Sequence, residues 1–248
     1  MKLSLFLLVV CILFPGCKES AIDHPEFERY FRQYNVEGSF LLYDLRNDSY
    51  TYYNLERCKK PFIPASTFKI FNSLVALETG VIKDETVVLP WNGVHRATAA
   101  WNQDQDMTAA IKNSTVWFYE ELARRIGEKN MQRSISLVRY GNMNIAGGID
   151  MFWLTGKLRI SQMEQIQFLK RLYTEELPFS PRTMQIVKKI LIQEETPLYT
   201  PSCSPQPVLA LSVLFFATNI ESENPDESLF PGARIAITRQ ILQDLQLL

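Results

Sequence analysis

A serine and a lysine stand three residues apart in the segment Ser66-Thr67-Phe68-Lys69, where a long apolar run begins. If this run is a helix, the two side chains share one face of its first turn. The serine can then act as a nucleophile, and a neutral lysine as the base that takes its proton. Unpaired N–H groups and a partial positive charge at a helix N-terminus favour an oxyanion at the same place. The segment therefore predicts acyl-transfer chemistry.

The neighbours of Lys69 affect its charge. Phe68, Ile70 and Phe71 predict a dry pocket, and desolvation lowers the pKa of a lysine from its usual value of about 10.4. A neutral lysine can accept a proton or react with carbon dioxide to form a carbamate. Taken alone, however, Ser-x-x-Lys also fits a capped helix with a solvated lysine, so other residues must decide between the two interpretations.

The elements that must position this pair follow from hydrophobic periodicity and turn residues. Two strands joined by a turn at Asn47-Asp48 are predicted, followed by a loop and a buried helix that Gly80 ends. Four further helices follow, one of them opened by the capping box Ser161-Gln162-Met163-Glu164. The predicted ranges are strands 38–48 and 49–55, loop 58–65, and helices 66–79, 115–126, 161–173, 182–193 and 231–248.

Strands near both ends of the chain, with helices between them, predict an α+β fold. We expect one domain over 18–248, with an antiparallel sheet lobe formed by 38–56 and 208–248 and an inserted helical lobe over 66–195. In this layout Ser66 lies at the seam between the lobes, where clefts usually form.

The composition excludes several classes of function. The 248 residues carry a net charge of −1, without the basic excess that nucleic-acid binding requires. The two histidines, His24 and His95, lie far apart, and the sequence has no Cys-x-x-Cys or His-Glu-x-x-His pattern. We therefore expect no metal site. The sequence does not indicate an oligomeric state.

Residues 1–17 are predicted to be a bacterial export signal. Lys2 precedes an apolar run from Leu3 to Phe14, which is too short to span a bilayer. Gly16-Cys17 also resembles the end of a lipoprotein cleavage site, which would place a lipid on Cys17. Secretion into the periplasm, lipid attachment through Cys17 and an uncleaved anchor are the alternatives.

Three further stretches make the Ser66–Lys69 pair part of a larger pattern. Ser114-Thr115-Val116, Tyr140-Gly141-Asn142 and the run from Gly147 to Ser161 around Trp153 follow it in that order. Together with Ser66 to Lys69, this set resembles the class D, oxacillinase-type serine β-lactamases over residues 38–195 and again from 215 onward. The resemblance implies a β-lactamase/transpeptidase-like fold, hydrolysis of penicillins and no cofactor beyond carbon dioxide.

The resemblance also implies a role for each matching residue. Ser66 is the nucleophile that opens the β-lactam ring, and Lys69, once N-carboxylated, is the general base for acylation and deacylation. Ser114 passes a proton to the departing ring nitrogen. The supporting residues are Val116, which keeps the lysine pocket dry, Trp153, which binds the carbamate, Tyr140 and Asn142 at the cleft wall, and Arg234, which binds the substrate carboxylate.

Each of these residues also has a purely structural interpretation. Ser114 fits a helix N-cap, and Tyr140-Gly141-Asn142 fits an ordinary turn. Trp153 and Val116 fit a plain core, and Arg234 fits a surface ion pair. The order of the motifs favours the enzymatic interpretation.

One signature of the family is absent. No Lys-Thr-Gly follows Glu195, and the chain there reads Pro197-Leu198-Tyr199-Thr200-Pro201-Ser202-Cys203-Ser204-Pro205-Gln206-Pro207. Because proline cannot donate to a sheet ladder, we expect the sheet to be incomplete around 197–214. An internal deletion or a frameshift that later restores the frame explains the loss, and natural divergence is the alternative. Ser39 likewise stands where many relatives have a cysteine that pairs with the position of Cys58.

The lost strand carries the second backbone N–H of the family's oxyanion hole. Loss of one such donor typically costs about 10²–10³ in rate, so we expect weak or no hydrolysis. Two other interpretations stay open, namely a penicillin-binding sensor that remains acylated and an inactive truncated product.

Overall fold

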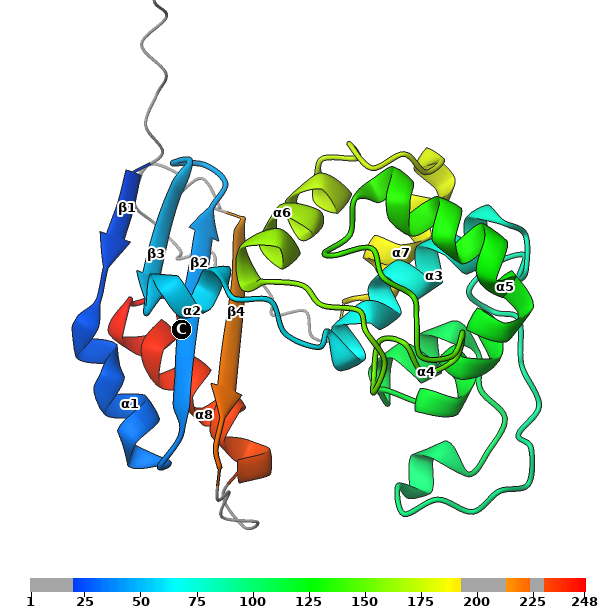
Figure 1. The fold of residues 1–248 in the computed structure, drawn as a ribbon, viewed down its shortest axis with the longest axis horizontal. Helices are drawn as coiled ribbons and strands as arrows, with labels where there is room; N and C mark the ends of the chain where they lie inside the picture. The colour runs from blue at the N-terminus through cyan, green and yellow to red at the C-terminus, as the bar shows by residue number, and fades with distance from the viewer. Residues whose placement is uncertain (1–19, 193–212, 224–229) are drawn as a thin grey trace, which may run out of the picture.

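The protein consists of a sheet lobe and a helical lobe that lie side by side (Figure 1). A computed structural model describes residues 20–192, 213–223 and 230–248. The predicted export signal with Cys17, and the proline-rich interval with the first residues of the strand expected from Val208, lie outside these ranges. Within them, no helix is long and apolar enough to cross a membrane.

The sheet has the strand order β1-β3-β2-β4. A hairpin of β2 (Glu37–Asp44) and β3 (Ser49–Tyr53) forms its centre, close to the predicted ranges. β4 (Leu214–Glu221) pairs antiparallel with β2, so strands from both ends of the chain share one sheet, as predicted. The expectation of a purely antiparallel sheet is corrected, because β1 (Ser20–Asp23) runs parallel to β3.

Alternate residues of β2 face two different helical layers. Phe40 and Leu42 pack with helices α1 (Glu28–Gln33) and α8 (Phe230–Asp244) on one face. Leu41 and Tyr43 face α2 (Leu55–Lys59) and α6 (Gln162–Tyr173) on the other. A strand with both faces covered reads as a continuous apolar run, which accounts for the sequence Phe-Leu-Leu-Tyr.

The helical lobe surrounds the buried helix α3 (Phe68–Glu78). A short 3₁₀ turn at Ala65–Thr67 precedes it, and Gly80 with φ +70° follows its end, as predicted. The Ser161 capping box that opens α6 is also confirmed. The remaining helices of this lobe are α4 (Met107–Lys112), α5 (Val116–Val138) and α7 (Pro181–Ile190), with 3₁₀ turns at Pro25–Phe27 in the sheet lobe and Ala99–Trp101 here.

Two predicted boundaries are corrected. The predicted loop over 58–65 begins later, because Cys58 and Lys59 form the last turn of α2, which Asn54 caps through its side chain. The helix predicted to end at residue 126 continues after Gly127, whose φ of +74° and ψ of 159° interrupt the helical conformation before a second segment runs to Val138. Cys58 is a buried free thiol.

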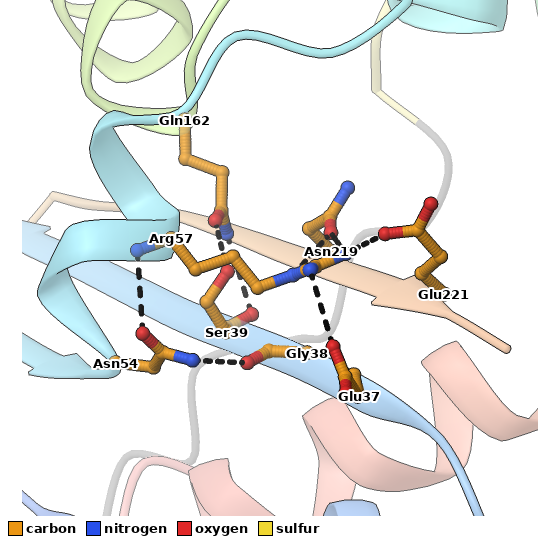
Figure 2. A network of polar contacts seen from close by, with 8 residues as sticks. All are labelled: Glu37, Gly38, Ser39, Asn54, Arg57, Gln162, Asn219 and Glu221. Carbon is orange, nitrogen blue, oxygen red and sulfur yellow. Dashed lines mark hydrogen bonds and ion pairs between the residues drawn. The ribbon is translucent and has the colours of Figure 1, made fainter.

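Polar side chains join the sheet to α2 and α6 (Figure 2). From α2, the Arg57 guanidinium donates to Asn219 Oδ1 at 2.7 and 2.9 Å and to Glu221 Oε2 at 3.0 Å, both on β4. At the start of α6, Gln162 donates to a β4 carbonyl at 2.7 Å and accepts a hydrogen bond from Ser39 on β2. These contacts fix β4 against the hairpin and against the helical lobe.

Candidate active site

Ser66, Lys69 and Ser114 form a closed triangle of hydrogen bonds where the two lobes meet. The Lys69 ammonium donates to Ser66 Oγ at 3.0 Å and to Ser114 Oγ at 2.7 Å. Ser114 Oγ in turn donates to Ser66 Oγ at 3.0 Å. The predicted nucleophile and base therefore do share one face of the first helical turn, and Ser114 joins them from 45 residues further along the chain.

Lys69 is nearly inaccessible to solvent, with 1% of its surface exposed, whereas Ser66 is exposed. Burial lowers the pKa of Lys69 from 10.5 to about 8, because a charged ammonium loses hydration in an apolar environment. About a tenth of the lysine is then neutral at pH 7. The predicted dry pocket is confirmed, and its lysine can act as a base near neutral pH.

Ser114 occupies a backbone position that usually requires glycine. It follows the C-cap of α4 with φ +52°. The N–H of Ser114 donates to Ile111 O at 3.2 Å, and the N–H of Thr115 donates to Ala110 O at 2.8 Å. This pair of bonds defines a Schellman motif, in which glycine is favoured at the left-handed position. The N-cap interpretation of Ser114 is therefore wrong, since Thr115 takes the N-cap position of α5.

Trp153 lies in the core beside the nucleophile turn. Its indole stacks on Phe68 with ring centroids 5.1 Å apart, and its carbonyl accepts from the Ala65 N–H at 3.0 Å. The indole Nε1–H is buried and has no hydrogen-bond partner among the described residues. Because buried indole N–H groups normally find an acceptor, this donor, together with the lowered pKa of Lys69, fits a carbamate formed from carbon dioxide on Lys69.

A groove of about 550 Å³ begins beside the nucleophile turn, at Thr67 and Ile70. It continues along β4, past Phe216 and Thr218, to Arg234 on α8. In the part of the chain that the structure describes, β4 is an edge strand of the sheet. Arg234 is exposed and forms no ion pair with any described residue, so the surface ion-pair interpretation finds no support there.

The same region of the chain matches a known family. The model of the penicillin binding protein transpeptidase domain matches residues 32–201. The chain is 35% identical to β-lactamase OXA-48 of Klebsiella pneumoniae, over 97% of this chain and 95% of that relative. A crystal structure of the class D β-lactamase YbXI from Nostoc is 44% identical, with a TM-score of 0.80, 91% of this chain and 100% of that chain covered. The chain belongs to the class D β-lactamases.

Another relative is matched over a shorter stretch. The probable β-lactamase YbxI of Bacillus subtilis is 43% identical over 166 residues, which span 67% of this chain and 62% of that relative. The described residues contain no group of histidine, cysteine and acidic side chains that could hold a metal ion.

The Tyr140-Gly141-Asn142 motif of this class D chain lies partly in the core. Tyr140 is only 1% exposed and packs edge-on against Phe68, so its expected place at the cleft wall is corrected. Asn142 is exposed, donates to Lys157 O at 2.9 Å and accepts from the Arg159 N–H at 3.0 Å. A Cβ on residue 141 would lie 2.1 Å from the Arg159 carbonyl oxygen, so only glycine fits at this position.

Val116 is the first residue of α5 and is half-buried, two positions after Ser114. Two residues that contact this turn, Gln105 and Trp101, were not identified from the sequence. Thr115 Oγ1 donates to Gln105 Oε1 at 3.4 Å, and both side chains are buried. The indole of Trp101 donates to Asn113 O at 2.9 Å. Neither contact has a local sequence signal, since 10 and 12 residues separate the partners.

Proposed function

We propose that this protein hydrolyses β-lactam antibiotics, penicillins among them, through an acyl-enzyme on Ser66. The observation that carries the proposal is the triangle of Ser66, Lys69 and Ser114, in which a serine hydroxyl lies 3.0 Å from a buried lysine of lowered pKa. Membership in the class D family supports it, because the similar proteins are named β-lactamases.

The first half of the reaction follows from the geometry. Ser66 Oγ attacks the β-lactam carbonyl carbon, and its proton moves toward Lys69, either directly or through Ser114 Oγ, which contacts both groups. As the C–N bond of the ring breaks, Ser114 returns a proton to the ring nitrogen. Two short bonds hold Ser114 in reach of the lysine, through its hydroxyl at 2.7 Å and its carbonyl at 2.6 Å.

Carbon dioxide, when bound to Lys69 as a carbamate, supplies a carboxylate base. Lys69 and Trp153 are the residues that would hold it, through the Nζ atom and the unpartnered indole N–H. The dry surroundings of Lys69 preserve the neutral amine from which such a group forms. In the second half of the reaction, the base at Lys69 activates the water that releases the acyl group from Ser66.

Arg234 is the residue that would bind the carboxylate of the substrate. Its exposed guanidinium lines the groove that starts at Thr67, next to the nucleophile. No lysine follows Lys189 in the sequence, so this cation has no Lys-Thr-Gly partner. The reduced activity that we expect from the loss of that motif remains a prediction.

We also propose export to the bacterial periplasm through residues 1–17, since the targets of β-lactamase substrates lie outside the cytoplasmic membrane. Radiolabelled palmitate separates the two forms of export. Incorporation that Cys17→Ser abolishes means a lipid anchor, and a soluble periplasmic product without label means secretion. Protein that stays in the cytoplasm contradicts the proposal.

Purified protein tested with a chromogenic cephalosporin and a fluorescent penicillin decides the function. Steady turnover that rises with bicarbonate and is absent in Ser66→Ala supports the proposal. A stable label on Ser66 without turnover indicates a penicillin-binding sensor instead. Neither signal, from a protein whose circular dichroism shows a folded chain, means that the site does not react with β-lactams.

A further inference from the structure

Trp101 contacts the peptide bond that sets the conformation of Ser114. The residue ends the 3₁₀ turn Ala99–Trp101, and its indole Nε1–H donates to Asn113 O at 2.9 Å. This carbonyl and the Ser114 nitrogen belong to the same planar peptide. The indole therefore restrains the plane whose rotation changes the φ angle of Ser114, which is +52°.

Trp101 is itself fixed from a second element. Its own carbonyl accepts a hydrogen bond from the indole of Trp117 at 2.8 Å, and Trp117 is buried in α5. Its backbone N–H donates to Thr98 O at 2.9 Å. The preceding carbonyl, of Ala100, accepts from Gln105 Nε2 at 2.7 Å. The Trp101 donor is thus held at a fixed place relative to α5, the helix that starts just after Ser114.

Ser114 needs such a restraint because its conformation is unfavourable for serine. A residue with a Cβ is strained in the left-handed region, and strained residues persist where their surroundings determine them. The Schellman bonds hold the N–H groups of Ser114 and Thr115. These bonds do not involve the Asn113 carbonyl. Among the described residues, only the indole of Trp101 donates a hydrogen bond to that carbonyl. Release of this peptide plane would move the Ser114 hydroxyl and carbonyl away from Lys69.

We propose that Trp101 is a positioning residue for the acyl-transfer reaction. Its indole N–H keeps Ser114 in the conformation in which both the hydroxyl and the carbonyl reach Lys69, at 2.7 and 2.6 Å. The inference rests on the proposed function for its kinetic consequences, and on the geometry alone for its structural ones. A misplacement of about 1 Å in a reacting group can cost about 10²-fold in rate.

The test is Trp101→Phe, which keeps an aromatic ring and removes the N–H. We expect kcat for a chromogenic cephalosporin to fall by about 10- to 100-fold with KM within about twofold, because the change affects proton transfer and not binding. Trp91→Phe is the matched control, since the Trp91 indole donates to Val94 O at 3.1 Å and not to the carbonyl of Asn113. This control should keep the wild-type kcat.

A double-mutant cycle separates positioning from general damage. In a Ser114→Ala background, Trp101→Phe should cause a much smaller loss of kcat and of the rate of Ser66 acylation, because the hydroxyl is gone and only the carbonyl of residue 114 still reaches Lys69. An equal loss in both backgrounds would overturn the proposal. So would a Trp101→Phe protein with the kcat of the wild type.

A crystal structure of the Trp101→Phe variant gives a readout that needs no activity. We expect Ser114 to leave the left-handed region or to occupy two conformations, with longer distances to Lys69. An unchanged Ser114 with both contacts intact would contradict the inference. If the wild-type protein does not react with β-lactams, the proposed function fails, and this structure still decides the role of Trp101.

Discussion

The side chains on the two sides of the candidate site differ in how firmly their contacts hold them. On the side of the helical lobe, hydrogen bonds of 2.6 to 3.0 Å connect Ser66, Lys69 and Ser114, and α3 behind them is buried. On the side of the sheet lobe, the groove runs along β4, which is an edge strand within the described part of the chain, to Arg234. Arg234 has no ion-pair partner among the described residues. The residues that make and break bonds are held far more firmly than those available to hold a substrate.

The difference follows from what supports each side. Phe68 stacks on Trp153 and meets Phe152 and Tyr140 edge-on, so the turn that carries Ser66 belongs to the aromatic core of the helical lobe. Among the described residues, that core contains none beyond Leu191. The sequence change lies between Glu195 and the start of β4, the strand along which the groove runs. A chain can therefore keep the acylation centre of the family while its substrate cleft changes.

On the helical-lobe side of the site, we expect the largest effect from Lys69→Ala. Removal of a general base costs about 10²–10⁴ in rate, so we expect hydrolysis of a chromogenic cephalosporin to fall by that factor, with or without bicarbonate. Lys112→Ala, at an exposed lysine that ends α4, is the control and should retain full rate. A Lys69→Ala protein that is still stimulated by bicarbonate would place the base elsewhere.

The next test separates chemistry from stability at one position. Ser114→Gly removes the hydroxyl but suits the left-handed backbone of the Schellman motif. We expect a loss of about 10²-fold or more in kcat, with a free energy of unfolding about 1 kcal/mol higher than that of Ser114→Ala. Kinetics and urea denaturation measure the two effects. Equal stability of the glycine and alanine variants would mean that position 114 carries no strain.

Some features of the site could be predicted from the sequence, whereas the conformation of Ser114 could not. The spacing of Ser66 and Lys69 and the capping box at Ser161 predicted their local structure correctly, because the interactions lie within one helical turn. The motif Ser114-Thr115-Val116 indicated a family but not a conformation, since its glycine-like turn contains no glycine. Trp101 gave no signal, because its contact with Asn113 depends on how a loop folds back over 12 residues.

The sheet side was harder still to predict. β1 has the sequence Ser-Ala-Ile-Asp with every residue exposed, so no hydrophobic pattern marks it or its parallel pairing with β3. Arg57 was likewise missed, although it joins α2 to Asn219 and Glu221 on β4. Such long-range polar contacts have no periodicity that a single sequence could reveal.

On the sheet-lobe side of the site, Arg234→Gln should weaken substrate binding and leave the rate of the chemical steps unchanged. A charge-assisted hydrogen bond contributes about 1.5–3 kcal/mol, so we expect KM for carboxylate-bearing penicillins to rise by about 10- to 100-fold with little change in kcat. Arg239→Gln is a matched control on the same helix and groove. If Arg239→Gln raises KM as much as Arg234→Gln, Arg234 is not the specific binding partner of the substrate carboxylate.

The smallest effect that we expect is a pH dependence of stability that originates in Lys69. Burial lowers its pKa from 10.5 to about 8 in the folded protein. Between these values the unfolded chain holds a proton that the folded chain has released, so the contribution of Lys69 to stability rises with pH across this window. Below pH 8 both states are protonated, and the buried charge opposes folding in full.

Lys69→Met removes this titration and should therefore gain stability over the wild type most clearly below pH 8. Its advantage should shrink steadily as pH rises toward 10.5, the ordinary value for lysine. Thermal midpoints in bicarbonate-free buffers measure the difference, so that no carbamate stabilises the wild type. Lys112→Met, at an exposed lysine of α4, is the matched control substitution. A Lys69→Met advantage that widens with pH would mean that the folded protein binds the Lys69 proton more tightly than the unfolded chain, so that burial does not lower the pKa of Lys69.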